Sequence, residues 1–165
     1  AVKVALAEAE RRVQAIATVH AALSQNVDES VDFDEVARTI VRMAGAIAST
    51  DHAVEVITTG SFGTIQADQA QALATVLNEL VANSVEHGLA DRDGLIEVRA
   101  EREGTSMTVT VADDGVGFVP GTPMSGLGTQ IVHQMVRGEL KGSIEWAPRE
   151  GGGTLVTLHA NLDPA

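Results

Sequence analysis

The chain has 165 residues, and its 11 Lys and Arg against 23 Asp and Glu give a formal net charge of −12 at pH 7. A surface this acidic repels nucleic acids and anionic membranes, so we expect neither as a direct partner. The absence of Cys excludes disulfides, thiolate metal sites and thiol catalysis. No apolar run reaches the length of a membrane span, and the length fits one domain with at most a short appendage.

The first part of the chain predicts two helices. Residues 1–24 carry a heptad-like seam, which is typical of a helix that packs against a partner helix; its members are Leu6, Ala9, Val13, Ile16, His20 and Leu23. A second amphipathic helix is predicted for residues 34–49, with its inward positions at Val36, Ile40, Ala44 and Ile47. The chain opens mid-pattern on Ala rather than Met, so we expect a fragment of a longer protein.

The polar stripe of the next helix is the most informative feature. Residues 53–66 change period and predict two short strands around a Gly60 to Gly63 turn, and Asp68 is the predicted N-cap of a long helix. On that helix Glu79, Asn83 and His87 are four residues apart and stack on one face of an otherwise apolar segment. A buried polar row costs free energy unless it is paired, which indicates a ligand. The alternative is a set of surface or locally satisfied polar residues.

The second half of the chain predicts strands and one further helix. Residues 95–102 and 106–113 alternate apolar and polar positions around Gly104 and predict a hairpin. A helix is predicted for residues 126–138, and two closing strands for 142–147 and 154–160. This order favours an α+β two-layer sandwich, in which a mixed, mainly antiparallel sheet carries helices on one face.

Three glycine-marked loops complete the pattern. In the loop DDGVGF, Gly115 and Gly117 let the backbone pass close to a planar ligand, and Asp113 can accept a hydrogen bond from an exocyclic amine. The loop SGLG at 125–128 precedes a helix, whose free N–H groups suit a polyphosphate. In the third loop Thr154 follows two glycines. One interpretation is that its hydroxyl reaches a base or an ordered water, and the alternative is that the loop is only a Gly-rich turn before a strand.

Together these motifs resemble the N, G1, G2 and last boxes of the GHKL ATP-binding superfamily, in order and over residues 51–162. The sequence has no GxxxxGK[ST], which excludes a P-loop NTPase, and no GxGxxG after a first strand, which excludes a Rossmann domain. The resemblance implies a GHKL (Bergerat) fold for residues 31–165, with residues 1–30 as the C-terminal part of a dimerisation region.

The resemblance also implies ATP and Mg²⁺ as cofactors. Asn83 would bind a Mg²⁺ that bridges the phosphates, because an amide oxygen is a hard ligand, and Asp113 would contact the adenine amine with support from Thr154. Residues 119–125 would form a lid over the nucleotide. Glycines would shape both ends of the site: Gly115 and Gly117 on the adenine side, and Gly126 and Gly128, with Leu127, on the phosphate side.

Two further positions of the helix have implied roles. Glu79 occupies the position from which GHKL hydrolases recruit a general base; in a kinase it would act on the attacking imidazole or order Mg²⁺ through water. Glu79 and Asn83 are therefore the catalytic candidates. Many histidine kinases carry a lysine where this chain has Glu86. The resemblance therefore implies that His87, the next residue, makes the phosphate contact in place of that lysine.

The N-terminal third resembles the segment between the phosphoacceptor box and the ATPase domain in HisKA_2-type sensor histidine kinases. This implies the catalytic part of a bacterial, cytoplasmic two-component kinase, a homodimer at full length, that phosphorylates a histidine outside the fragment. His20 lacks the neighbours of a phosphoacceptor box and is interpreted as a seam residue. The implied partner is a response regulator, including the kind with an RNA-binding antiterminator domain.

Two other functions stay open at this stage. An anti-sigma-factor serine kinase shares the fold, and its N box also ends in His and Gly, but the two N-terminal helices weigh against it. A noncatalytic, nucleotide-responsive dimerisation module is the alternative from a different class. The remaining histidines, His52, His133 and His159, are interpreted as surface or core-edge residues.

Overall fold

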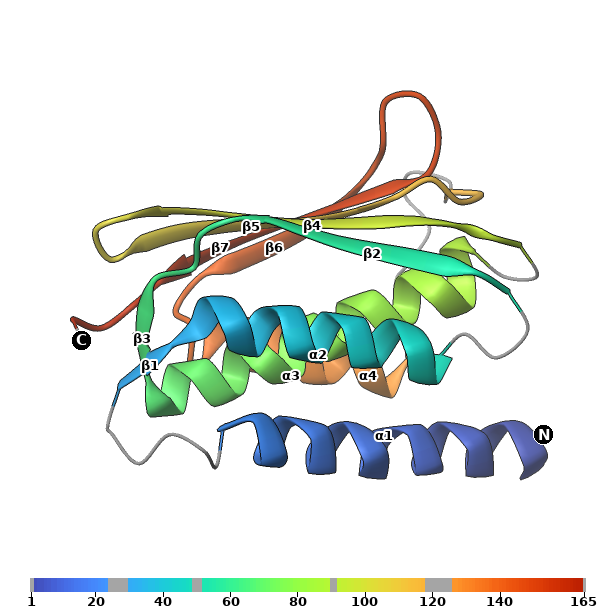
Figure 1. Ribbon diagram of the computed structural model, residues 1–165, viewed down its shortest axis with the longest axis horizontal. Coiled ribbons are helices and arrows are strands. Elements are labelled where there is room, and N and C mark those ends of the chain that lie inside the picture. The colour runs from blue at the N-terminus through green and yellow to red at the C-terminus, as the bar shows by residue number, and fades with distance from the viewer. Residues whose placement is uncertain (1, 24–29, 49–51, 90–91, 118–125, 165) are drawn as a thin grey trace.

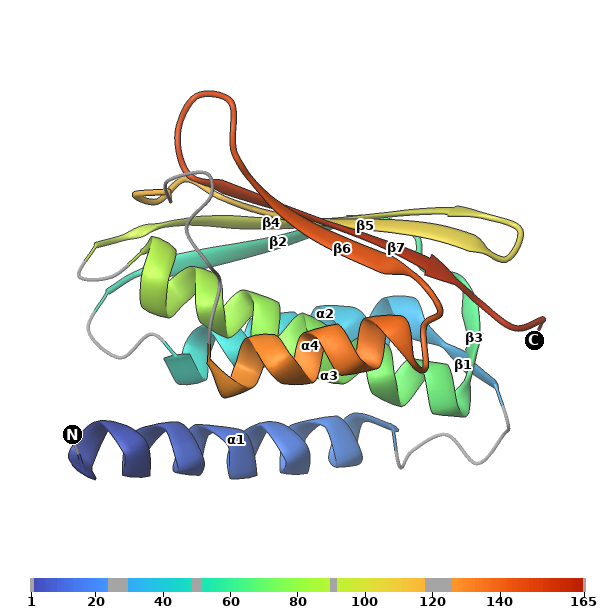
Figure 2. The same ribbon diagram turned by 180° about the vertical axis from the view of Figure 1, so that it is seen from behind.

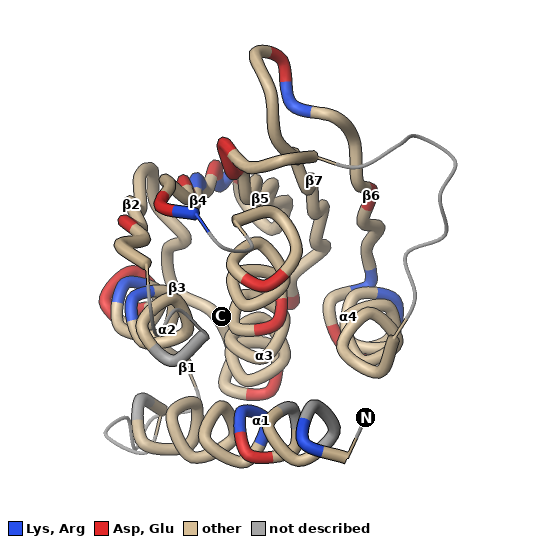
Figure 3. Tube along the Cα trace, turned by 90° about the vertical axis from the view of Figure 1, so that its right-hand side faces the viewer, with Lys and Arg blue, Asp and Glu red and all other residues tan. Residues whose placement is uncertain are grey.

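The computed structural model describes residues 2–23, 30–48, 52–89, 92–117 and 126–164. A β-sheet forms one layer, the helices α2, α3 and α4 lie against one of its faces, and α1 lies beneath these helices (Figure 1). The end-on view in Figure 3 shows α2, α3 and α4 side by side under the sheet. The predicted α+β sandwich is confirmed.

The sheet is mixed, as the sequence predicts. Within the described ranges it has five strands in the order β2-β4-β5-β7-β6, and only the β2–β4 pair is parallel. A separate ladder joins β1 to β3 in antiparallel fashion. In chain order the strands are β1 (Ser30–Asp32), β2 (Val54–Gly60), β3 (Thr64–Gln66), β4 (Gly94–Glu103), β5 (Ser106–Asp113), β6 (Ser143–Pro148) and β7 (Thr154–Asn161).

The helices agree with the predicted ranges to within one or two residues. They are α1 (Val2–Leu23), α2 (Phe33–Ala48), α3 (Ala67–Asn83) and α4 (Leu127–Arg137). The long predicted helix does not continue as an α-helix to its end, because a π-helical turn, η1 (Ser84–Gly88), follows α3 directly. In Figure 2, α4 lies in front of α3, on the side of the sheet that β6 and β7 form.

Three local expectations are wrong or incomplete. Asp68 is not the N-cap of α3: the helix begins at Ala67, so Gln66 is the N-cap and Asp68 lies in the first turn. The strands β2 and β3 flank the predicted Gly60 to Gly63 turn but belong to different sheets. Strand β1 has no counterpart among the predicted elements, because a three-residue strand is defined by its distant partner and not by a pattern of its own.

The core lies between the sheet and the helices and is built around α3. Leu73, Leu77 and Leu80 of α3 are buried against inward-facing residues of the strands, such as Val98 and Leu158. The inward positions predicted for α2 at Val36, Ile40 and Ala44 are buried, whereas the side chain of Ile47 lies outside the described residues. Burial of α3 on nearly every side fixes its last turn, and so the side chains that follow it, against the end of the sheet.

Helix α1 packs on the domain with a stripe other than its predicted seam. Among the described side chains of α1, Arg11, Ala15 and Val19 are buried, whereas Leu6 and Ile16 of the seam are 60% and 70% exposed. Apart from Leu23, which packs against the core, the described members of the seam therefore face away from it. Among the described residues no helix combines the length and apolar character that crossing a membrane requires.

Candidate functional site

A pocket of about 360 Å³ opens where the ends of β5 and β7, the turn η1, the start of α4 and one face of α1 meet. This volume is in the range of small-molecule sites. Its lining residues are Arg11, Arg12, Leu80, Asn83, Ser84, Glu86, His87, Gly88, Asp113, Gly117, Gly126, Leu127, Gly128, Thr129, Trp146, Thr154 and Val156. Of the predicted site residues, eight line the pocket, whereas Gly115 and Glu79 lie next to lining residues.

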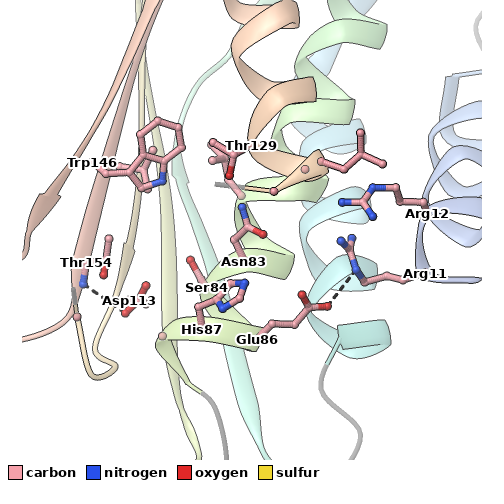
Figure 4. A pocket seen from close by; sticks show the side chains of 17 residues that line it. Arg11, Arg12, Asn83, Ser84, Glu86, His87, Asp113, Thr129, Trp146 and Thr154 are labelled. Atoms are coloured by element: carbon pink, nitrogen blue, oxygen red, sulfur yellow. Dashed lines mark hydrogen bonds and ion pairs between the residues drawn. The ribbon is translucent and has the colours of Figure 1, made fainter. Parts of the chain in front are cut away.

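Asp113 lies at the sheet end of the pocket (Figure 4). It ends β5 opposite Thr154 of β7, and its side chain is buried. Its Oδ1 accepts hydrogen bonds from the amides of Gly115, at 3.0 Å, and Thr154, at 3.3 Å. Thr154 thus supports the Asp113 carboxylate through its backbone N–H, and contact of its hydroxyl with a base or an ordered water stays a prediction.

The charge state of Asp113 reflects this setting. Burial raises the pKa of the Asp113 carboxyl above its ordinary value, opposed by hydrogen bonds from Gly115, Thr154 and the Ser84 hydroxyl, while the charge of Asp114 raises the pKa further. A carboxylate has room for about four hydrogen bonds, so Asp113 retains an acceptor site for an amine in the pocket.

Glycines bring three backbone segments together around Asp113. A Cβ on Gly115 would collide with the carbonyl oxygen of Gly88, and the amide of Val116 donates to that same oxygen at 2.8 Å. A Cβ on Gly88 would lie 2.8 Å from Oδ1 of Asp113. The spacing of the DxGxG loop thus lets the chain dock on η1 beside the carboxylate. Gly117 adopts φ +73°, which a glycine tolerates.

The start of α4 forms another wall. Gly126 is the N-cap with φ +121°, and the amide of Gln130 makes the first helical bond to its carbonyl at 3.1 Å. The amides between these two residues are therefore directed outward from the helix end, which favours an anion. The predicted lid, residues 119–125, lies outside the described residues.

Asn83 and His87 both line the pocket, but His87 does not continue the α-helical stripe that Glu79 and Asn83 share. Asn83 ends α3 and lies between the sheet and α1 in Figure 4, whereas His87 belongs to η1 and is exposed. The i→i+5 bonds of a π-turn change the angular spacing of the residues that follow. The single polar row predicted for Glu79, Asn83 and His87 is therefore wrong at His87.

Glu79 is buried beneath two arginines of α1. Its Oε2 lies 3.5 Å from Nη2 of Arg11, and its Oε1 lies 3.6 Å from Nε of Arg12. Arg11 also places its Nε 3.0 Å from Oε1 of Glu86. This carboxylate, which the sequence marks as a polar residue in an apolar helix, thus receives its compensating charge from a different helix.

The pocket residues that the sequence analysis missed include Arg11, Arg12 and Trp146. Adjacent arginines on a helix are usually solvent-exposed charges, and no local pattern marks these two as pocket residues. Trp146, the single Trp of the chain, lies on β6 with its ring 5.4 Å from that of His133. From the sequence, an aromatic residue on a strand is expected to belong to the hydrophobic core. Only the position of Trp146 beside the cavity indicates that it contacts a ligand.

The donor set fits a weakly held divalent cation better than a protein cage. Over the ranges that the structure describes, no group of three or more His, Asp or Glu residues converges on one point. Mg²⁺ commonly binds through one or two protein ligands together with substrate phosphates and water. Asn83 in the pocket satisfies that requirement.

Comparison with known proteins agrees with this geometry. Residues 68–164 match the family described as histidine kinase-, DNA gyrase B-, and HSP90-like ATPase, and residues 1–47 match a family described as histidine kinase, HisKA_2. The chain belongs to the histidine kinase-, DNA gyrase B-, and HSP90-like ATPase family. ATP is therefore the ligand that the family assigns to this domain.

Individual relatives are sensor histidine kinases. The chain is 40% identical over 159 residues to sensor histidine kinase PdtaS of Mycobacterium tuberculosis, covering 93% of this chain and 32% of the relative. PdtaS of Mycolicibacterium smegmatis is 40% identical over 163 residues, covering 96% and 33%. The chain thus spans about a third of the length of the curated relatives it matches.

Solved structures share the fold. The histidine kinase domain of the Erythrobacter litoralis EL346 blue-light activated histidine kinase superposes with a TM-score of 0.73 at 25% identity, covering 93% of this chain and 74% of that one. The ATP-binding domain of PrrB from Mycobacterium tuberculosis gives 0.65 at 20% identity, covering 82% and 99%.

Proposed function

We propose that this chain is the catalytic, ATP-binding part of a sensor histidine kinase, which transfers the γ-phosphoryl group of ATP to a histidine outside the 165 residues. The observation that supports the proposal is that two parts of the pocket carry different chemical groups. Asp113, a hydrogen-bond acceptor that suits the adenine amine, lies at one end, and outward-directed amides at the start of α4 lie on another wall.

The proposed roles follow from this arrangement. The adenine amine would donate to Asp113, with Gly115, Gly117 and Thr154 shaping the surroundings of that carboxylate. The phosphates would bind at the amides that follow Gly126, including those of Leu127 and Gly128. Chemistry of this class depends on positioning and on neutralisation of phosphate charge, more than on covalent participation by the protein.

Asn83 is proposed as the Mg²⁺ ligand, and His87 as a phosphate contact from η1. The metal ion would neutralise phosphate charge, while Asn83 holds it at the junction between α3 and the pocket. Glu79 is proposed to order water ligands of Mg²⁺ or to act on the attacking imidazole, because its buried carboxylate lies beside Gly128 in the first turn of α4. The partner proposed for the phosphorylated histidine is a response regulator, including one with an RNA-binding antiterminator domain.

Binding can be tested on the 165-residue chain. Trp146 is the single Trp, lines the pocket and is a natural fluorescence reporter. Titration with ATP in the presence of Mg²⁺ should change its emission saturably, and excess Mg²⁺-ATP should protect the protein against thermal unfolding. A chain that neither changes emission nor gains thermal stability at millimolar ATP would contradict the proposal.

Transfer can be tested on the natural polypeptide that contains this chain, with ATP labelled in the γ-phosphate. Asn83→Ala should abolish acid-labile labelling and leave the circular dichroism spectrum unchanged. Gln71→Ala is the matched control, because Gln71 is an exposed amide on the same helix. Label that instead appears on a serine of an added protein would favour an anti-sigma-factor kinase, and ATP binding without transfer would favour a noncatalytic module.

A further inference from the structure

Arg11 and Arg12 bring two cations to the pocket of a chain whose net charge is −12. Both come from α1, and Figure 4 shows their side chains directed from α1 toward the pocket, on the side away from Asp113 and Thr154. The whole side chain of Arg11 is only 9% exposed and that of Arg12 18%. Guanidinium groups are seldom buried to this degree without a specific partner.

The known partners of these arginines leave several donors unused. Among the described residues, Nε and Nη1 of Arg11 and Nε of Arg12 are buried without a hydrogen-bond acceptor. Glu79 and Glu86 lie at ion-pair distance and supply charge, but they do not satisfy these N–H groups geometrically. A buried donor without an acceptor costs about 1–3 kcal/mol, so this corner of the pocket favours an additional anion.

The arginines also lie close to the proposed phosphate site. An ideal Cβ built on Gly128, in the first turn of α4, would lie 3.0 Å from Nη2 of Arg12 and in collision with Oε2 of Glu79. The guanidinium of Arg12 and the outward-directed amides of α4 therefore face the same space. Planar guanidinium groups bind phosphate oxygens through two parallel hydrogen bonds, which makes them selective for that ligand.

We propose that Arg11 and Arg12 bind the γ-phosphate of ATP with the N–H groups that Glu79 and Glu86 leave free, so that α1 distinguishes ATP from ADP. The inference rests on the proposed function, because it takes the pocket to be the ATP site. Glu79 then holds the two guanidinium groups in place, and ADP, which lacks the third phosphate, leaves their free donors without an acceptor.

The test measures nucleotide selectivity, the ratio of the dissociation constants for two ligands. The ligands are a non-hydrolysable ATP analogue with a β,γ-imido bridge and ADP, each with Mg²⁺. Arg12→Gln removes one cation, and the double variant Arg11→Gln, Glu86→Gln removes an ion pair without changing the net charge. Arg38→Gln is the control, because Arg38 is an exposed residue of α2 that does not line the pocket. Dissociation constants follow from the emission of Trp146.

We expect Arg12→Gln and the double variant each to weaken binding of the ATP analogue about thirtyfold, the size of one lost charge-assisted hydrogen bond, while ADP affinity and the control stay at the wild-type level. An equal loss for both nucleotides, or no loss, would overturn the inference and show that the arginines only attach α1 to α3. If the unaltered chain binds neither nucleotide, the proposed function itself fails.

Hydrogen exchange supplies a readout that does not depend on affinity. At saturating nucleotide, the amides of α1 around Arg11 and Arg12 should exchange more slowly with the ATP analogue than with ADP. This difference should disappear in Arg12→Gln and persist in Arg38→Gln. Equal protection by both nucleotides in the unaltered chain would contradict a γ-phosphate contact from α1.

Discussion

Replacement of Asp113 by Asn separates the two tasks of this carboxylate, anchoring its own loop and accepting a hydrogen bond from the ligand. In the structure Oδ1 accepts from the amides of Gly115 and Thr154 at 3.0 and 3.3 Å. An asparagine retains an oxygen for these two bonds, but its second terminal group is an N–H donor. The loop should keep its conformation, whereas an adenine amine would face a donor.

The expected loss is that of one charged hydrogen bond, about 2 kcal/mol, or about thirtyfold in the dissociation constant for ATP. Guanine presents a carbonyl oxygen where adenine has its amine, so Asp113→Asn should lose less affinity for GTP than for ATP. Isothermal titration calorimetry of both nucleotides measures the two effects. Unchanged ATP affinity in Asp113→Asn would refute the adenine contact.

The same variant has a pH signature in the absence of nucleotide. Because the pKa of Asp113 is raised above its ordinary 3.8, the folded state binds the proton more tightly, and this group's contribution to stability falls as the pH rises above 3.8 through the folded pKa. Asparagine has no such dependence. In urea denaturation, the free energy of unfolding of Asp113→Asn relative to wild type should therefore increase from pH 3.5 to pH 7, and a pH-independent difference would contradict burial of the charge.

Three other substitutions, one of them with a matched control, test the packing of the site and of the core. Gly128→Ala should weaken Mg²⁺-ATP binding measured by Trp146 emission, because its Cβ would lie 3.0 Å from Nη2 of Arg12; wild-type affinity would argue against the described start of α4. Gly153→Ala should destabilise the fold by about 1–3 kcal/mol in thermal melts, because φ is +100° and its Cβ would collide with the Asp113 carbonyl. Gly151→Ala is the control and should destabilise the fold less, because φ is +90° but no described atom lies within 4 Å of its Cβ. Phe62→Ala should cost about 3–5 kcal/mol in urea denaturation, because this side chain is 1% exposed, and a smaller loss would indicate looser packing.

The elements with a strong local pattern could be predicted from the sequence. The β4–β5 hairpin follows from strict alternation around Gly104, which adopts φ +60°, and α4 follows from the glycine at its N-cap. The glycine loops are predicted to lie at the ligand site because each lies at the end of a regular element. In all these cases the residues that form the sequence pattern lie within about ten positions of the structural element that the pattern predicts.

Features that depend on distant packing could not be predicted in this way. The ion pairs of Arg11 and Arg12 with Glu79 join residues more than sixty positions apart, and nothing in the local pattern of α1 distinguishes them from surface charges. Trp146 likewise reaches the pocket only through the place of β6 at the edge of the sheet. Strand pairings and pocket walls of this kind follow from tertiary contacts, not from periodicity.

The π-helical turn η1 makes the number of residues in this segment a determinant of the site. A π-helical turn holds about one residue more than an α-helical turn, so after removal of Ser84 or Val85 this segment would continue α3 with α-helical geometry, and the residues that follow would keep nearly the same direction. The side chains inside the turn, Glu86 and His87, would then change direction relative to the pocket that they line, although both remain in the sequence. Substitutions alone would not expose this dependence, whereas a single-codon deletion would.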